Sequence, residues 1–302
     1  FMYSAFYSFD SSRMIDFLEQ EGLAVKTERG NRVFPQSDKS SDVLQTLQKA
    51  LRRRNVTVRL HTKMTGLMIE DHICKGVKVQ SYHGALETLA ADDVILTTGG
   101  LAYPSTGSTG DGQRLLKQAG VALEPCYPAL VPVETVEEWP IRLQGLSLRN
   151  VSLRVERGSH KIYEEQGEML FTHFGVSGPL VLSASSLLGR KGAKDCKLHI
   201  DLKPALSEEQ LDERLQRDFA AQKNSMFKNS LGKLLPSKLI PVIVELSEIT
   251  PDKQVNEVTR QERHRLVKLC KDLTCTVKKL RDFPEAIVTG GGISVKAINP
   301  AT

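Results

Sequence analysis

The sequence has 302 residues, 40% of them hydrophobic and 25% charged, which is the composition of a folded globular protein. No apolar run approaches the roughly 18 residues that cross a bilayer, so membrane-spanning, collagen-like and disordered classes are excluded. The 41 Lys and Arg residues against 36 Asp and Glu residues give a net charge of +5, too small a bias for a dedicated nucleic-acid binder. At roughly 150 residues per domain, the length predicts about two domains.

The cysteines and the first residues indicate the compartment. The five cysteines, an odd number, stand at positions 74, 126, 196, 270 and 275. Their spacing forms neither a disulfide framework nor a paired CxxC zinc site. The first residues also lack the basic and apolar regions of an export signal. We therefore expect a cytoplasmic protein that binds no metal.

The first part of the chain is typical of helices followed by short strands. Asp10–Ser12 is a helix N-cap pattern, after which apolar residues recur on one face as far as Gly22. A second amphipathic helix begins near Ser40 and ends in the arginines 52–54, which complement the helix dipole. Short β-type runs follow at 56–60, 64–69, 76–79 and 86–89.

A continuous apolar run, 93–98, leads into Gly99 and Gly100. This pattern is typical of a buried parallel strand that ends in a glycine-rich turn, where a ligand can approach the main chain. A tight surface turn is the alternative. The GxxxxG spacing at 107–112 lacks the following Lys and Ser or Thr of a phosphate loop, which excludes an ATPase. A helix is expected from about 112 to 119.

From Pro125 the sequence changes to proline-rich, alternating segments, which favour antiparallel strands of a separate domain. The run 286–288 then leads into Gly290, which repeats the pattern of a buried strand followed by glycines. Strands are expected at 151–155, 168–172, 197–202 and 274–280, and helices at 179–188, 207–223, 230–247 and 259–270.

His173 lies in a polar, glycine-containing turn that follows an apolar run. An imidazole in such a turn can act as an acid or a base near neutral pH. The alternative is a loop residue that bonds a carbonyl group. No other histidine lies within five residues of it, which disfavours a metal cluster.

Five segments of the sequence carry a family resemblance by their order. They are residues 31–40, 97–112, 128–133, 167–179 and 286–295. Together they resemble the BaiN/YhiN-type, or aminoacetone-oxidase-like, family of bacterial NAD(P)/FAD-dependent oxidoreductases, over essentially the whole chain. The resemblance implies an α/β fold with an incomplete glutathione-reductase-like FAD-binding domain at 1–126 and 285–302. An inserted substrate domain at 127–284 would contain a β-barrel and a helical lobe at about 205–272.

The resemblance also implies which residues hold FAD. The main chain of Met64 would meet the adenine, and the two glycine segments would lie against the flavin dinucleotide. Asp111 and His173 are our candidates for catalytic residues, because hydride chemistry at carbon needs a proton partner. The implied cofactor-binding residues are Met64, Thr97, Thr98, Gly99, Gly100, Ser108, Thr109, Gly110, Gly112, Gly290, Gly291 and Gly292.

Two parts of the family pattern have no counterpart in this sequence. The family begins with a strand, a GxGxxG turn and a helix that hold the pyrophosphate. It also continues beyond the second glycine strand. We therefore expect this chain to be the middle of a flavoprotein, truncated at both ends.

Three functions follow from these observations. The first is an FAD-dependent oxidoreductase that moves a hydride between the flavin and a small organic substrate, with NAD(P)H as a candidate reductant. The second is a non-catalytic remnant or binding protein that holds no FAD. The third is a flavin-linked RNA-modifying protein, suggested by the basic runs 52–54 and 278–281. These runs lack interleaved aromatic residues, so a small-molecule partner is favoured over nucleic acid.

Overall fold

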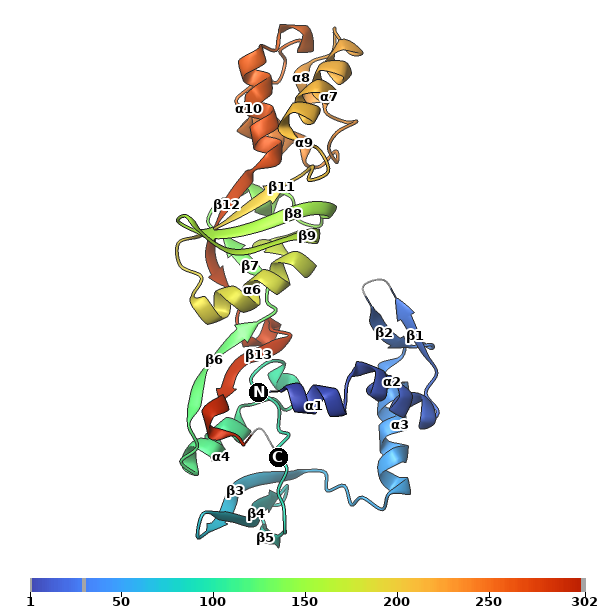
Figure 1. The fold of residues 1–302 in the computed structure, drawn as a ribbon, viewed down its shortest axis with the longest axis vertical. Helices are drawn as coiled ribbons and strands as arrows, with labels where there is room; N and C mark the ends of the chain where they lie inside the picture. The colour runs from blue at the N-terminus through green and yellow to red at the C-terminus, as the bar shows by residue number, and fades with distance from the viewer. Residues whose placement is uncertain (1, 29–30, 300–302) are drawn as a thin grey trace. The chain divides into compact units, whose positions relative to one another are not determined.

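The computed structural model describes residues 2–28 and 31–299, and their contacts divide the chain into two compact units. The first unit contains the described residues up to Leu96, residues 115–122 and the residues from Ile293 onward. The second unit contains residues 97–114 and 123–292. Figure 1 shows the helices and strands of both units.

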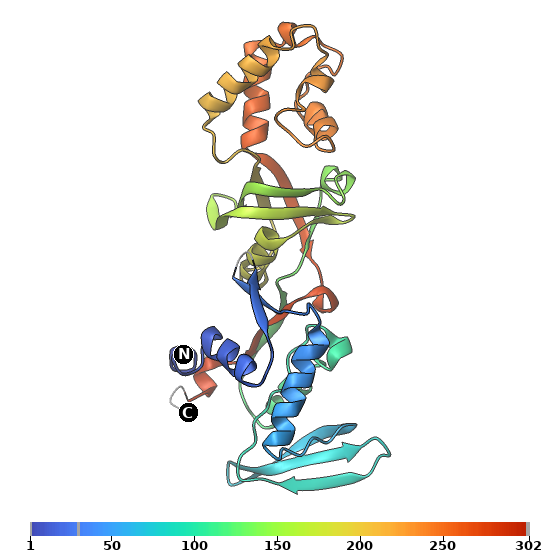
Figure 2. The same ribbon diagram turned by 90° about the vertical axis from the view of Figure 1, so that its right-hand side faces the viewer.

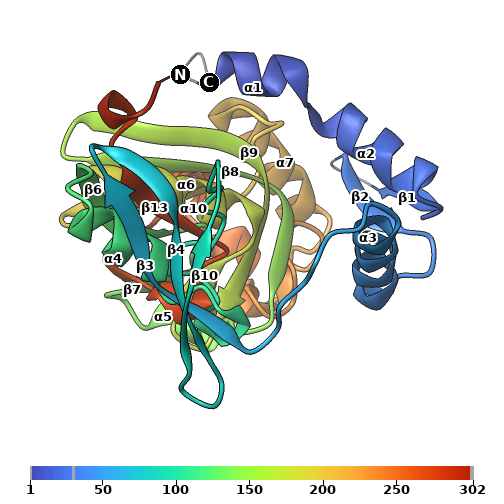
Figure 3. The ribbon, with the colours of Figure 1, turned by 90° about the horizontal axis from the view of Figure 1, so that it is seen from below.

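The first unit is built from short helices and two small antiparallel sheets, the pair β1–β2 and the meander β3–β4–β5. Helix α3 contacts both α2 and β2 (Figure 3). The elements are α1 (Tyr3–Ser8), α2 (Ser11–Gln20), β1 (Val25–Glu28), β2 (Arg32–Pro35), α3 (Ser40–Arg53), β3 (Thr62–Glu70), β4 (Ile73–Ser81), β5 (Leu86–Ala90) and a 3-10 turn, Val295–Ala297.

The arginine run at the end of α3 is used inside the first unit. Arg54 donates to the Glu21 carboxylate at 2.7 Å, and Arg53 contacts the same carboxylate. The hydrogen bond from Arg54 lowers the pKa of Glu21. Two of the three arginines therefore join the ends of α2 and α3.

The second unit contains a closed six-stranded barrel and a helical lobe. The strand order around the barrel is β10–β7–β12–β11–β8–β9, and β9 pairs with β10 to close it. This confirms an α/β chain with a β-barrel and a helical part. The strands are β6 (Leu123–Ala129), β7 (Val133–Thr135), β8 (Ser147–Arg157), β9 (His160–Thr172), β10 (Gly175–Ser177), β11 (Cys196–Asp201), β12 (Leu273–Leu280) and β13 (Val288–Ile293).

Seven helices accompany these strands in the described residues from 97 onward. Proline at the first position of α6 fits its fixed φ and missing amide. The helices are α4 (Asp111–Gln118), α5 (Trp139–Arg142), α6 (Pro179–Lys191), α7 (Glu208–Ala220), α8 (Phe227–Ser230), α9 (Ile240–Leu246) and α10 (Arg260–Lys271), with 3-10 turns at Pro104–Thr106, Val255–Glu257 and Phe283–Glu285.

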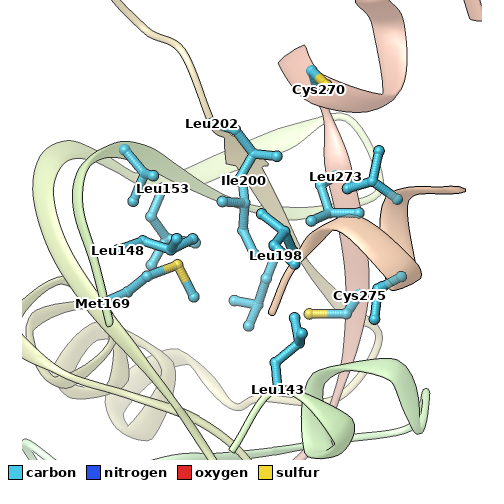
Figure 4. Packing of buried hydrophobic residues seen from close by; sticks show 14 of the residues in the cluster. Leu143, Leu148, Leu153, Met169, Leu198, Ile200, Leu202, Cys270, Leu273 and Cys275 are labelled. Carbon is cyan, nitrogen blue, oxygen red and sulfur yellow. The ribbon is translucent and has the colours of Figure 1, made fainter. Parts of the chain in front are cut away.

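The barrel closes around side chains that alternate along its strands. In β8, Val151, Leu153 and Val155 are buried at every second position, as the two-residue period of a strand requires. Figure 4 shows Leu153 of β8, Leu198 of β11 and Cys275 of β12 directed into the same interior. The barrel therefore forms one continuous apolar core.

The pairing of β7 with β12 brings two distant parts of the chain together. Backbone hydrogen bonds continue beyond these strands, from the Arg281 amide to the Pro132 carbonyl at 3.0 Å and from the Ile287 amide to the Leu130 carbonyl at 3.4 Å. Strands β6 and β13, which lie just beyond, form a two-stranded sheet. Barrel closure thus sets β6 beside β13.

The helical lobe lies at one end of the barrel (Figures 1 and 2). Its helices α7 and α10 each begin with a capping box, at Ser207 and Thr259, which satisfies the first free amides reciprocally. Arg263 of α10 donates to Asp212 of α7 at 2.6 Å, and this hydrogen bond lowers the pKa of Asp212. Capping boxes therefore stabilise the N-termini of α7 and α10, and the hydrogen bond between Arg263 and Asp212 joins the two helices.

Several expected elements differ from those found. Residues 93–98 form no strand, and Ile95 is 87% exposed. The reason is that no described strand lies beside this run to complete its hydrogen bonds. Residues 56–60 form no strand either. Of the expected helix 230–247, only Ile240–Leu246 is a full helix, α9. Pro236 lies in the irregular segment before it, where its missing amide does not support a helix.

The second glycine segment lies inside a strand rather than after one. Strand β13 includes residues 290–292 and pairs with β6 in a sheet of two strands. The expectation that 286–288 is a buried strand is wrong, since Val288 is 45% exposed. A sheet of only two strands, which helix α6 contacts through β6, does not bury both of its faces.

Leu198→Ala tests the barrel core. Leu198 is fully buried, so the truncation leaves a cavity, and we expect the free energy of unfolding to fall by about 2–5 kcal/mol. Urea unfolding measures this loss. Val136→Ala is the control, because Val136 is exposed and should change the free energy by less than about 0.5 kcal/mol. Equal effects of the two variants would contradict the described core.

Candidate functional site

The glycine turn, residues 97–112, is joined to β13 by one hydroxyl group. The amides of Leu101 and Ala102 donate to Oγ1 of Thr289 at 2.8 and 3.0 Å. Leu101 and Thr289 are 188 residues apart in the sequence. This contact brings the two predicted glycine segments together within the second unit.

The chain's own packing requires some of these glycines. A Cβ atom at Gly100 would lie 2.4 Å from Oγ1 of Thr289, and one at Gly291, where φ is +80°, would lie 2.2 Å from the Pro125 carbonyl oxygen. Glycine at these positions lets the turn approach β13 and lets β13 approach β6. Close approach of the protein's own backbone thus explains both residues without a ligand.

The glycine turn also offers hydrogen-bond donors. In the described part of the chain, the amides of Gly99, Gly100 and Ser108 donate to no protein acceptor. Thr97 and Thr98 beside them are exposed. Such amides can donate to the carbonyl oxygens or ring nitrogens of a planar cofactor.

Asp111 places a carboxylate at the start of α4. It accepts hydrogen bonds from Oγ1 of Thr109 at 3.2 Å and from Arg114 at 3.0 Å. A carboxylate complements the positive end of the helix dipole, so it competes with a phosphate for that position. The glycine turn therefore fits an uncharged acceptor group better than a pyrophosphate.

The predicted cofactor residues fall into two groups. Met64 belongs to β3 of the first unit, where it pairs with Val79. The residues that belong to the glycine turn, the start of α4 or β13 are Thr97, Thr98, Gly99, Gly100, Ser108, Thr109, Gly110, Gly112, Gly290, Gly291 and Gly292.

His173 lies at the edge of the barrel, in the turn between β9 and β10. Its exposed ring meets the Phe174 ring edge-on, with the centroids 4.8 Å apart. The Arg281 guanidinium lies 4.7 Å from the centroid of Phe174. Among the described residues, no hydrogen bond joins His173 to the glycine turn, so its role in proton transfer stays a prediction.

Arg281 belongs to an ion network at the same edge. It donates to Glu134 at 2.6 Å and to Glu285 at 2.7 Å, and Lys279 lies 3.4 Å from Glu134. Burial alone would raise the pKa of Glu134, but the hydrogen bonds from Arg281 and Lys279 outweigh it and lower that pKa. Part of the basic run 278–281 is thus neutralised within the barrel.

Nothing in the sequence singles out Thr289 or Phe174. Thr289 is a hydroxyl residue just before a glycine, and only the folded structure shows that the amides it reaches are those of Leu101 and Ala102. The contact between Phe174 and Arg281 likewise depends on barrel closure. Both are tertiary features that local patterns do not contain.

The described residues contain neither a candidate metal-binding group nor a candidate membrane-spanning helix. Within residues 2–28 and 31–299, no three His, Cys, Asp or Glu side chains gather closely enough to hold a metal ion. In the same ranges, no helix combines the length and hydrophobicity that crossing a membrane requires.

Comparison with known proteins places the barrel and lobe in a family. Residues 127–288 match the family described as "HI0933-like protein barrel and H2TH domain", and this range is more than half of the 302 residues. The chain belongs to the HI0933-like family. The matched range of the HI0933-like chain contains the complete six-stranded barrel and helices α7–α10.

The HI0933-like chain is similar to proteins with two kinds of name. A 3-dehydro-bile acid delta(4,6)-reductase of Clostridium scindens is 28% identical over 296 residues, which are 97% of this chain and 70% of the relative. A ribosomal RNA dihydrouridine synthase of Escherichia coli is 26% identical over 308 residues, 100% of this chain and 71% of the relative. The synthase of the same name from Haemophilus influenzae is 29% identical over 210 residues, 70% of this chain and 50% of the relative. The reductase name supports the oxidoreductase class.

Thr289→Val tests the contact between the glycine turn and β13. The variant keeps the shape but removes the acceptor of two amides, so we expect the free energy of unfolding to fall by about 1–3 kcal/mol. Amide hydrogen exchange at Leu101 and Ala102 should become faster. Thr289→Ser retains the hydroxyl and should retain the protection. Wild-type exchange rates in Thr289→Val would show that the hydroxyl does not hold the turn.

Glu134→Gln tests the ion network through pH. Because the folded state lowers the pKa of Glu134 below its ordinary value of 4.5, the ionised carboxylate stabilises the fold above that pH, and the contribution is lost as the pH falls through the lowered pKa. Melting temperatures between about pH 6 and about pH 3 should therefore fall less steeply in Glu134→Gln than in the wild type. Glu124→Gln should follow the wild type. Parallel curves for Glu134→Gln would argue against the network.

Proposed function

We propose that this HI0933-like chain is a flavin-dependent oxidoreductase that reduces an activated carbon–carbon double bond. The observation that carries the proposal is its similarity to the Clostridium scindens reductase over 97% of the chain. The order of the glycine segments and their meeting through Thr289 support a cofactor surface in the second unit.

The names of the relatives share one reaction type. A delta(4,6)-reductase is named for double bonds at positions 4 and 6, in a compound that "3-dehydro" describes as a ketone. Dihydrouridine is uridine with one ring double bond reduced. Both names thus describe the addition of two hydrogens across a double bond conjugated to a carbonyl group. We take this reaction type as the common chemistry and infer it for this chain.

The residues of the glycine turn fit the flavin ring. When bound, FAD supplies the hydride, and NAD(P)H is the reductant that we propose for it. The amides of Gly99, Gly100 and Ser108 would donate to the ring's acceptors. We also propose that the main chain of Met64 meets the adenine, in a glutathione-reductase-like domain formed by 1–126 and 285–302.

Reduction of a double bond also needs a proton for the second carbon. Asp111, which Thr109 and Arg114 hold in place, and His173 are the groups that we propose for this step. An acid within hydrogen-bond reach of that carbon contributes about 10²- to 10⁴-fold to the rate. One of the two should therefore dominate turnover.

RNA is the second candidate for the substrate class. Two of the relatives are named ribosomal RNA dihydrouridine synthases, and one aligns with the whole chain. A uracil ring offers the same conjugated double bond as an enone. The flavin chemistry is unchanged in this alternative, and only the surface that binds the rest of the substrate differs.

Anaerobic turnover with FAD and NADPH tests the proposal. A 3-oxo steroid with a conjugated double bond and a uridine-containing RNA are offered separately. We expect one of them to gain two hydrogens, detected by mass spectrometry, and Asp111→Asn or His173→Ala to slow turnover by about 10²-fold. Asp92→Asn is the matched control, because Asp92 is exposed and lies outside the glycine turn. It should leave turnover unchanged.

Three results would count against the account. Absence of a flavin absorbance band after incubation with FAD would favour a remnant that binds no cofactor. Bound flavin without reduction of either substrate would contradict the proposed reaction. Wild-type turnover in both Asp111→Asn and His173→Ala would leave the reaction standing but overturn the assignment of the proton donor.

A further inference from the structure

A pocket of about 190 Å³ lies where the barrel meets the helical lobe. The beginning of β8, Lys203 after β11 and the loop between α8 and α9 line it. Two of its lining residues, Arg149 and Lys203, are cationic, and none is acidic. We refer to Arg149, Asn150 and Lys203 as the cationic notch.

A break in the barrel's pairing creates one wall of the cationic notch. The register between β8 and β9 shifts between Leu148 and Val151, which leaves Arg149 and Asn150 out of the regular ladder. Both residues are exposed. A β-bulge of this kind redirects side chains and is frequent beside binding sites.

Lys203 also lines the pocket, and it forms no ion pair among the described residues. It is partly buried, and its ammonium group donates to no acceptor in the described part of the chain. Burial lowers the pKa of Lys203, and the nearby Arg214 lowers it further. Burial raises the pKa of Cys270, its other titratable neighbour, to about 12, so that thiol is neutral. The acid Asp201 pairs instead with Lys271 at 2.5 Å.

We propose that the cationic notch binds a backbone phosphate of an RNA substrate. This inference rests on the second substrate class above and adds to it the surface that would hold the polynucleotide. The runs 52–54 and 278–281 are less suited, because Arg53, Arg54, Lys279 and Arg281 already contact carboxylates.

The unpaired ammonium group of Lys203 carries a desolvation cost. A partly buried ammonium group without an anion loses hydration and gains nothing in return. A phosphate would restore that loss through charge-assisted hydrogen bonds from Lys203 and Arg149, and the amide of Asn150 can donate to a third oxygen. The pocket has room, since about 190 Å³ equals roughly six water molecules at about 30 Å³ each.

The test measures RNA binding and stability in the same variants. Fluorescence anisotropy with a labelled, uridine-containing single-stranded RNA gives the affinity at several salt concentrations. We expect Lys203→Met and Arg149→Met each to weaken binding about tenfold. Each should also reduce the slope of log affinity against log salt by about 0.7, the value for one phosphate contact on a single strand.

Lys203→Met also has a signature that a structural lysine would not show. Methionine keeps the apolar stem and removes the unpaired charge, so the thermal midpoint should rise or stay unchanged while RNA affinity falls. Lys223→Met is the matched control, because Lys223 is an exposed lysine of the same lobe outside the pocket. Equal losses of affinity in Lys223→Met and Lys203→Met would reduce the effect to general charge and overturn the notch.

The remaining outcomes separate this inference from the proposed function. No RNA binding by the wild type at low salt would overturn the notch, while reduction of the steroid enone would still support the oxidoreductase. A second experiment measures whether inorganic phosphate stabilises the wild type and Lys203→Met. If it stabilises the wild type but not Lys203→Met, and RNA affinity is equal in both, the pocket binds free phosphate and the RNA assignment is wrong.

Discussion

The pairing of β7 with β12 inside the closed barrel is the constraint on which the second unit depends. In the sequence, the other four barrel strands and the lobe lie between β7 and β12. Strand β6 comes directly before the barrel and β13 directly after it, and the pairing of β7 with β12 places them side by side. Only then can Thr289 accept hydrogen bonds from Leu101 and Ala102. The barrel and lobe thus shape the surface around residues 97–112 by holding their own two ends together.

The glycines of this surface show why a glycine motif is weak evidence for a ligand by itself. Gly100 and Gly291 are explained by contacts with Thr289 and Pro125. The features that favour a flavin are therefore the amides of Gly99, Gly100 and Ser108, which donate to no acceptor among the described residues. The carboxylate of Asp111 then limits what those amides can meet, because it disfavours a phosphate at the start of α4.

Local patterns predicted the elements whose packing is local. The helix starts at Asp10 and Pro179 and the alternating strand 151–155 follow from capping and periodicity, and the structure confirms them. The prediction of a buried strand at 93–98 was wrong, because a parallel strand needs neighbouring strands that its own sequence does not specify. Thr289 and Lys203 could not be found for a related reason. Their environments are made by strand pairings and helix contacts between residues far apart in the chain.

Hydrogen exchange with and without FAD tests whether barrel closure assembles the glycine turn and β13 into one flavin surface. If it does, saturating FAD slows exchange in residues 97–112 and in 288–293 together, and Thr289→Val weakens the protection of both segments. FAD binding that protects neither segment, or only one of them with Thr289→Val unchanged, would contradict it.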